Sequence, residues 1–133
     1  CLYGQDLSKD VTPVEASLSW VISKRRRKEG NFPGFKIINE QLVNGIKKCR
    51  VGISPFGKAP ARAGCEIFVN GGRKIGSITS GGYSPTLERP IAMGYVEEVF
   101  SKIGTEVLLS VRGKYLPAKI VNLPFVRPKY FRK

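Results

Sequence analysis

A switch in the spacing of apolar residues near position 48 constrains the fold more than any other feature of this sequence. Before it, apolar residues recur every three or four positions, and after it they recur every second position. A period of two places alternate side chains on one face of a β-strand, whereas a period of about 3.6 marks one face of a helix. The sequence therefore predicts a helical part followed by a β part.

Six short segments carry the two-residue period, and each predicts a half-buried strand. They are Cys49–Ser54, Ile67–Val69, Ile75–Thr79, Ile91–Tyr95, Val107–Val111 and Leu116–Ile120. Asn70-Gly71-Gly72 and Arg112-Gly113-Lys114 separate two pairs of these segments and predict hairpins. Short antiparallel strands in this arrangement favour a small β-barrel or jelly roll.

The first part of the chain carries helix signals. Residues 12–15, Thr-Pro-Val-Glu, have the form of a capping box with proline at the first helical position. The apolar residues that follow have helical spacing, and the basic run 24–28 before Gly30 suits a helix C-terminus. The sequence predicts a helix over residues 12–29 and a second one over Phe35–Leu42, ended by Asn44-Gly45.

The fold class that follows is α+β, mainly β, with a six-stranded antiparallel barrel or jelly roll after a helical segment. The boundary falls between residues 1–45 and residues 46–133. The only methionine is Met93, and the chain opens on Cys1, so we expect it to be part of a longer translated product.

Composition narrows the classes of function. The 23 Lys and Arg exceed the 10 Asp and Glu, which favours a polyanionic partner such as nucleic acid, a membrane surface or a polyglutamylated ligand, unless the acidic complement lies in the rest of the protein. The sequence lacks histidine and clustered carboxylates, so no metal is expected. Three cysteines without CxxC spacing favour a reducing compartment, and no apolar run approaches the roughly 18 residues of a membrane span.

An ordered series of motifs resembles the glycine cleavage T-protein family and its folate-dependent relatives. The motifs are Cys1-Leu2-Tyr3-Gly4-Gln5-Asp6, Thr12-Pro13-Val14-Glu15-Ala16, Trp20 with Lys24-Arg25-Arg26-Arg27, Phe32-Pro33-Gly34, Pro60-Ala61-Arg62 leading to Glu66-Ile67, Ile75–Gly81, Ser84-Pro85-Thr86-Leu87, Ile91–Val96, Val111-Arg112-Gly113-Lys114 and Pro124-Phe125-Val126. Each is weak alone, but their order runs from one end of the chain to the other.

The resemblance implies an enzyme whose domains surround a folate cavity. Residues 1–45 would be the C-terminal remnant of the central folate-binding domain, and residues 46–133 the C-terminal barrel domain. The parent would pass an aminomethyl carbon from lipoylated H-protein to tetrahydrofolate and release ammonia. The family's catalytic acidic residue lies upstream, so the chain alone is expected to be inactive. A monomer in the mitochondrial matrix or bacterial cytoplasm is expected.

By the same resemblance, two residues of this chain would contact folate, Arg26 and Tyr130. A guanidinium keeps its charge and makes paired hydrogen bonds to a carboxylate or carbonyl, and a tyrosine offers a flat ring and a hydroxyl. Arg25 competes with Arg26, because an ideal helix over residues 12–29 would direct Arg25 toward the apolar face.

Two other functions remain open from the residues alone. A basic β-barrel suggests a nucleic-acid-binding module, but the aromatic residues do not alternate with Lys and Arg on one strand face, so nucleic acid is not expected as a partner. A folate-binding relative in iron–sulfur cluster assembly, or in demethylation of dimethylglycine or sarcosine, would share this domain. The Lys24–Arg27 run together with Phe32-Pro33-Gly34 favours the T-protein.

Overall fold

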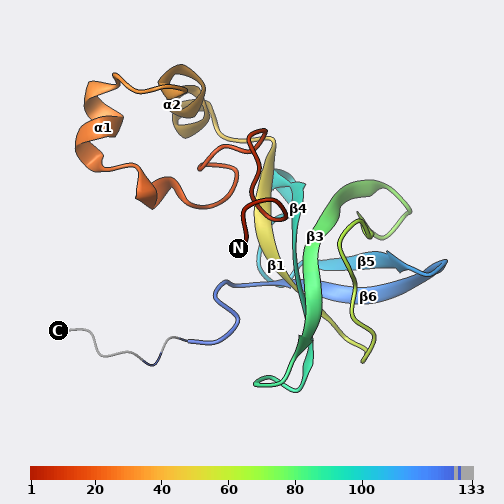
Figure 1. Cartoon of the computed structure of the whole chain (residues 1–133). Helices are drawn as coiled ribbons and strands as arrows, with labels where there is room; N and C mark the ends of the chain where they lie inside the picture. Colours follow the sequence, from red (N-terminus) through yellow and green to blue (C-terminus); the bar gives the residue numbers. More distant parts are fainter. Residues whose placement is uncertain (128, 130–133) are drawn as a thin grey trace.

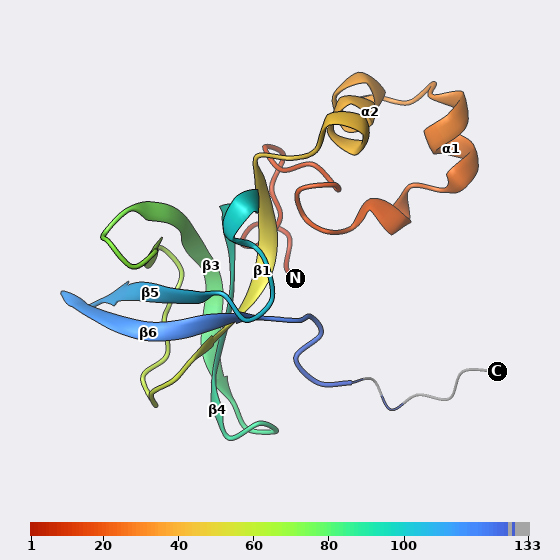
Figure 2. The ribbon, with the colours of Figure 1, turned by 180° about the vertical axis from the view of Figure 1, so that it is seen from behind.

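The computed structural model describes residues 1–127 and 129 as a β-barrel with a helical segment at one end (Figure 1). The strands are β1 (Lys48–Pro55), β2 (Glu66–Phe68), β3 (Lys74–Ser84), β4 (Arg89–Glu97), β5 (Glu106–Val111) and β6 (Lys114–Val121). The helices are the 3-10 turns η1 (Ser19–Val21) and η2 (Glu98–Phe100) and the α-helices α1 (Lys24–Glu29) and α2 (Phe35–Asn44). Figure 2 shows the same ribbon from behind, with both helices on one side of the barrel.

The barrel closes because β1 pairs with two neighbours along different parts of its length. Lys48–Ile53 pairs with β4, and Gly52–Pro55 pairs with β6. The strand order is β1-β4-β3-β2-β5-β6, and every pair is antiparallel. The predicted six-stranded barrel is confirmed, as are the two predicted hairpins, β2–β3 and β5–β6.

Alternate residues of the strands fill the barrel, as the two-residue period predicted. Ile53, Ile67 and Leu109 are fully buried at its centre. The rest of this core is Cys49, Val51, Ala61, Ile75, Ile78, Ala92, Val96, Val107, Ala118 and Ile120. At Gly76 a Cβ atom would lie 1.9 Å from the carbonyl oxygen of Tyr95, so only glycine lets β3 approach β4 this closely.

The continuous helix predicted over residues 12–29 is wrong. The capping box does form, because the N–H of Thr12 donates to Glu15 Oε2 at 3.0 Å and the N–H of Glu15 donates to Thr12 Oγ1 at 3.2 Å. The carbonyls of Glu15 and Ala16 then accept from Arg50 of β1 instead of from later helical amides. Ser17 adopts φ 55°, which ends the turn.

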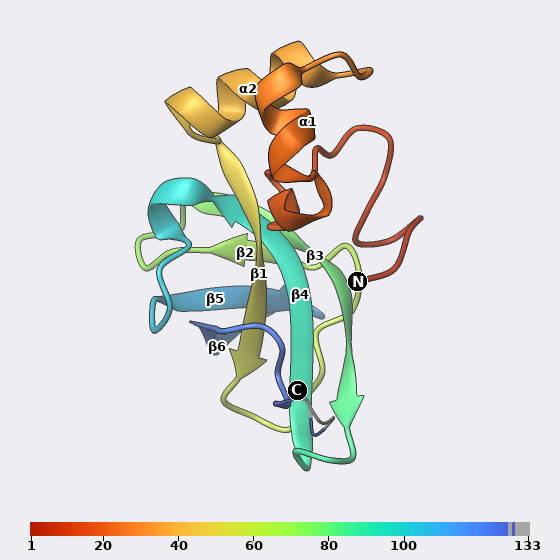
Figure 3. The same cartoon turned by 90° about the vertical axis from the view of Figure 1, so that its left-hand side faces the viewer.

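Helical structure resumes further along, in two separate helices. Ser23 caps α1 by accepting the Arg26 N–H at 3.3 Å, and Gly30 with φ 71° ends it. The second predicted helix is confirmed as α2, which leads directly into β1 in Figure 3. No helix of residues 1–127 reaches the length and hydropathy that crossing a membrane requires.

A buried carboxylate fastens the first residues of the chain to the barrel. Asp6 is 2% exposed, and its Oδ1 accepts from the hydroxyls of Thr79 at 2.6 Å and Ser80 at 2.7 Å. Its Oδ2 accepts from the N–H of Leu2 at 3.0 Å, and the Tyr95 hydroxyl donates to its carbonyl at 2.8 Å. Burial acts to raise the pKa of Asp6, but the hydrogen bonds from Thr79, Leu2 and Ser80 outweigh it and lower the pKa below 3.8.

The lowered pKa predicts a pH-dependent contribution to stability. Because the folded-state pKa of Asp6 lies below 3.8, the contribution is fully present above that pH and is lost as the pH falls through the folded value. We expect Asp6→Asn to lower the free energy of unfolding at neutral pH by about 1.5–3 kcal/mol, measured by urea denaturation. The difference from wild type should shrink in acid.

The exposed Asp10 provides the matched control for this substitution. Its carboxylate accepts no hydrogen bond from the described residues, so Asp10→Asn should change the stability by less than about 0.5 kcal/mol at any pH. Equal losses from Asp6→Asn and Asp10→Asn would contradict the assignment of Asp6 as the anchor.

Candidate ligand-binding site

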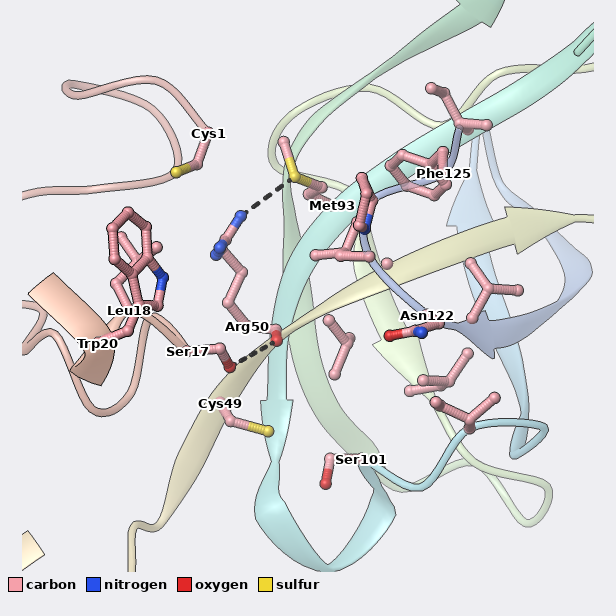
Figure 4. A pocket seen from close by; sticks show the side chains of 18 residues that line it. Cys1, Ser17, Leu18, Trp20, Cys49, Arg50, Met93, Ser101, Asn122 and Phe125 are labelled. Carbon is pink, nitrogen blue, oxygen red and sulfur yellow. Dashed lines mark hydrogen bonds between the residues drawn. The ribbon is translucent and has the colours of Figure 1, made fainter. Parts of the chain in front are cut away.

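A cavity of about 820 Å³ lies where three parts of the chain meet (Figure 4). One wall comes from residues 17–20, a second from β1 and β4, and a third from residues 120–125 at and after the end of β6. The lining residues are Cys1, Ser17, Leu18, Trp20, Cys49, Arg50, Val51, Gly52, Ile91, Met93, Ser101, Ile103, Ile120, Val121, Asn122, Leu123, Pro124 and Phe125. Its volume lies within the range of roughly 300–1,000 Å³ that is usual for small-molecule sites.

Arg50 holds one wall of this cavity against another. Its Nε donates to the carbonyl of Ala16 at 2.9 Å, and its Nη1 donates to Met93 Sδ at 3.4 Å. Its backbone N–H donates to the carbonyl of Glu15 at 2.8 Å, and the Ser17 hydroxyl donates to its carbonyl at 3.4 Å. Three of these hydrogen bonds fix the segment that leads to Trp20 onto β1, and the one to Met93 joins β1 to β4.

The cavity is mainly apolar and contains one charged side chain. Among the described lining residues, Arg50 is the only ionisable side chain that carries a charge at neutral pH, and none is Asp or Glu. Burial raises the pKa of the Cys49 thiol above 9.0, so this cysteine stays protonated and unreactive at neutral pH. The side chains present can bind and orient a ligand but offer no general base.

A smaller hollow of about 290 Å³ extends the cavity along the β3–β4 hairpin. Ile91, Met93 and Phe125 line both hollows, and Tyr83 lines the smaller one. Together they form a continuous apolar surface that begins beside the Arg50 guanidinium. Among the described residues, no three of His, Cys, Asp and Glu come together as metal ligands.

The structure does not bring the arginines predicted to contact folate into this cavity. Arg26 is exposed on α1 and donates from Nη1 to the carbonyl of Asn31 at 3.2 Å. Arg25 is also exposed and pairs with Glu29 at 3.8 Å. Tyr130 lies outside the described residues. The helical argument for Arg25 no longer applies, because residues 12–18 are not helical, and folate contact by Arg26 and Tyr130 stays a prediction.

Arg50 and Asp6 are the residues whose roles sequence analysis did not find. Asp6 stood inside the first family motif without an assigned role, and Arg50 stood in the first predicted strand as one of its polar, outward positions. Alternation placed Arg50 outside the barrel core but could not show that residues 15–18 would cover that outer face. The role of Arg50 becomes visible only in the folded structure, where its side chain bonds Ala16, 34 residues earlier in the chain.

Comparison with known proteins identifies the family. The sequence profile described as "Glycine cleavage T-protein C-terminal barrel domain" matches residues 48–127. The mitochondrial aminomethyltransferase of Dictyostelium discoideum is 52% identical over 132 residues, and that of Pisum sativum is 46% identical over 132 residues. These matches cover 98% and 99% of this chain and 32% of each relative.

A solved structure shows the same architecture. The glycine cleavage system aminomethyltransferase T from Bartonella henselae superposes with a TM-score of 0.94 at 42% identity, over 99% of this chain and 37% of that one. The chain thus spans about a third of the length of the proteins it matches. It belongs to the glycine cleavage T-protein family, and its residues 48–127 are the C-terminal barrel domain of that family.

Proposed function

We propose that the chain is the C-terminal third of a tetrahydrofolate-dependent aminomethyltransferase of the glycine cleavage system. The observation that carries this proposal is the extent of the likeness. Identity of 52% and a TM-score of 0.94 extend over nearly all of the chain, so they include residues 1–47 as well as the barrel. The alternatives of a nucleic-acid-binding barrel and a folate-binding relative with another reaction gain no support, because the relatives are named aminomethyltransferases.

The proposed reaction moves one carbon without oxidation or reduction. The aminomethyl carbon loses its bond to the lipoyl sulfur of H-protein and its bond to its own amino nitrogen, and it forms bonds to two nitrogens of tetrahydrofolate. Two N–H protons leave tetrahydrofolate, one going to the lipoyl thiol and one to the departing ammonia. Because the described cavity offers no general base, this chain contributes binding, and the proton transfers belong to the upstream part of the enzyme.

The proposed domain boundary lies between residues 45 and 46. Residues 1–45 would complete the central folate-binding domain, and residues 46–133 would form the barrel domain. The start of β1 at Lys48, after α2 ends at Asn44, supports this boundary. The contacts of Asp6 and Arg50 show that the first 18 residues nevertheless pack on the barrel. We therefore expect the two domains to move together rather than independently.

Lipoylated H-protein and tetrahydrofolate are the proposed partners, and the enzyme is proposed to act as a monomer. The names of several relatives include "mitochondrial", which supports the mitochondrial matrix as the compartment over the bacterial cytoplasm. The net charge of +13 would favour an acidic partner surface, and α1 exposes four of the 23 Lys and Arg, which are Lys24, Arg25, Arg26 and Lys28.

A chimera tests the proposed function. The C-terminal third of the Dictyostelium discoideum relative is replaced by this chain, and formation of methylenetetrahydrofolate is measured with lipoylated H-protein as donor. Because 52% of the residues are identical, we expect the chimera to retain at least about a tenth of the kcat/KM of the parent. The parent truncated before this segment is the control and should be inactive. A chimera that melts like the parent but transfers no carbon would refute the proposal.

The same chimera tests the predicted folate contacts. Arg26→Ala should raise the KM for tetrahydrofolate about ten-fold or more, because a charge-assisted hydrogen bond is lost, and Tyr130→Phe should raise it about three-fold. The neighbouring Arg25 is the matched control, since its exposed pair with Glu29 contributes little. If Arg25→Ala and Arg26→Ala have the same KM, the assignment of Arg26 is wrong.

A further inference from the structure

The guanidinium of Arg50 has hydrogen-bonding capacity that the described residues do not use. A guanidinium carries five N–H donors. In this structure one bonds the Ala16 carbonyl and one faces Met93 Sδ, and a thioether is a weak acceptor. At least three donors are therefore left without a partner among the described residues. Figure 4 shows the group reaching into the cavity, with Met93 on one side and Trp20 on the other.

No acidic side chain balances this charge from the described cavity walls. A cation beside apolar surface attracts an acceptor more strongly than one in water, because the local dielectric constant is lower. Carboxylates and polarised carbonyls match the planar fork of a guanidinium best. The charge arrangement thus selects a ligand that brings a carboxylate or carbonyl of its own.

The surfaces beside the guanidinium select a flat apolar group. Ile91, Met93 and Phe125 line both hollows. In Figure 4, Met93 and Phe125 lie on one side of Arg50 and Trp20 lies on the other. Thioether and aromatic side chains pack favourably against an aromatic ring. A planar ring on these residues would leave an attached carbonyl or carboxylate within the cavity, where the Arg50 donors are free.

We infer that Arg50 is a ligand-binding residue of this cavity and that its ligand is the aminobenzoyl-glutamate half of tetrahydrofolate. The ring packs on the apolar surface, and the guanidinium bonds a carboxylate of the glutamate. The choice of ligand rests on the proposed function, whereas the chemistry of the cavity does not. This subsite is separate from the predicted contacts of Arg26, which lies outside the lining of the cavity.

The single tryptophan of the chain makes the test specific to the site, because Trp20 lines the cavity. The probe is 4-aminobenzoyl-glutamate, and its uncharged analogue is 4-aminobenzamide. Binding to the 133-residue chain is measured by Trp20 fluorescence and by titration calorimetry. We expect saturable binding of the probe and binding of the analogue weaker by about ten-fold or more.

Arg50→Gln removes the charge and should weaken binding of the probe about ten-fold or more, while binding of the analogue changes little. Arg50→Lys keeps the charge but loses the planar fork, so its affinity for the probe should lie between those of wild type and Arg50→Gln. Arg62→Gln is the matched control. Arg62 also donates to a backbone carbonyl, that of Gly81 at 3.1 Å, but it does not line the cavity, so binding should be unchanged.

Three results would overturn the inference. The first is equal binding of the probe by wild type and a folded Arg50→Gln variant, with folding checked by thermal denaturation. The second is equal binding of probe and analogue by wild type, and the third is no saturable binding of the probe. The second and third apply even if Arg50→Gln does not fold. If the chimera transfers no carbon but the chain still binds the probe through Arg50, the proposed function is refuted and this inference about Arg50 is not. If the chimera is active but the chain does not bind the probe through Arg50, this inference is refuted and the proposed function is not.

Discussion

Arg50 is the residue through which the two parts of this chain become one structure. Its backbone belongs to β1, the strand that closes the barrel by pairing with both β4 and β6. Its side chain and backbone together bond residues 15–17. The same contacts replace the helix predicted for residues 12–18, fasten this segment to the barrel and form one side of the cavity.

Asp6 fastens the first residues of the chain to the barrel, as Arg50 fastens residues 15–17. It contacts β3 and β4. The hydroxyls of Thr79 and Ser80 and the backbone N–H of Leu2 donate hydrogen bonds to its carboxylate. Burial raises the pKa of the Tyr95 phenol, so its hydroxyl stays protonated and donates to the Asp6 carbonyl. With Arg50 and Asp6 both in place, the walls of the cavity are set by hydrogen bonds as well as by apolar contact. Such fixed walls suit a binding site, because a preformed site loses less entropy when ligand binds.

The barrel could be predicted from sequence because the residues that specify each strand and each turn are neighbours in the sequence. Val51, Ile67 and Leu109 each stand in a short alternating run, and the glycines at 71, 72 and 113 mark the hairpins between runs. The predicted helix over residues 12–29 failed for a nonlocal reason. Thr12 and Glu15 form their capping box, yet Arg50 donates hydrogen bonds to the carbonyls that a helix would use next. The candidate site was missed for the same reason, since no local pattern links residues 16, 50 and 93.

The sequence by itself determined the class of fold, the change from helix to strand near residue 48 and, through its ordered motifs, the family. Each of these depends on spacing along the chain, which folding does not alter. Only the tertiary structure decided that residues 12–18 do not form the predicted helix, which arginine faces the cavity and how Asp6 is buried. Those outcomes depend on hydrogen bonds between segments distant in sequence, such as Arg50 to Ala16 and Thr79 to Asp6, and a carbonyl that accepts from another strand is no longer available to a helix.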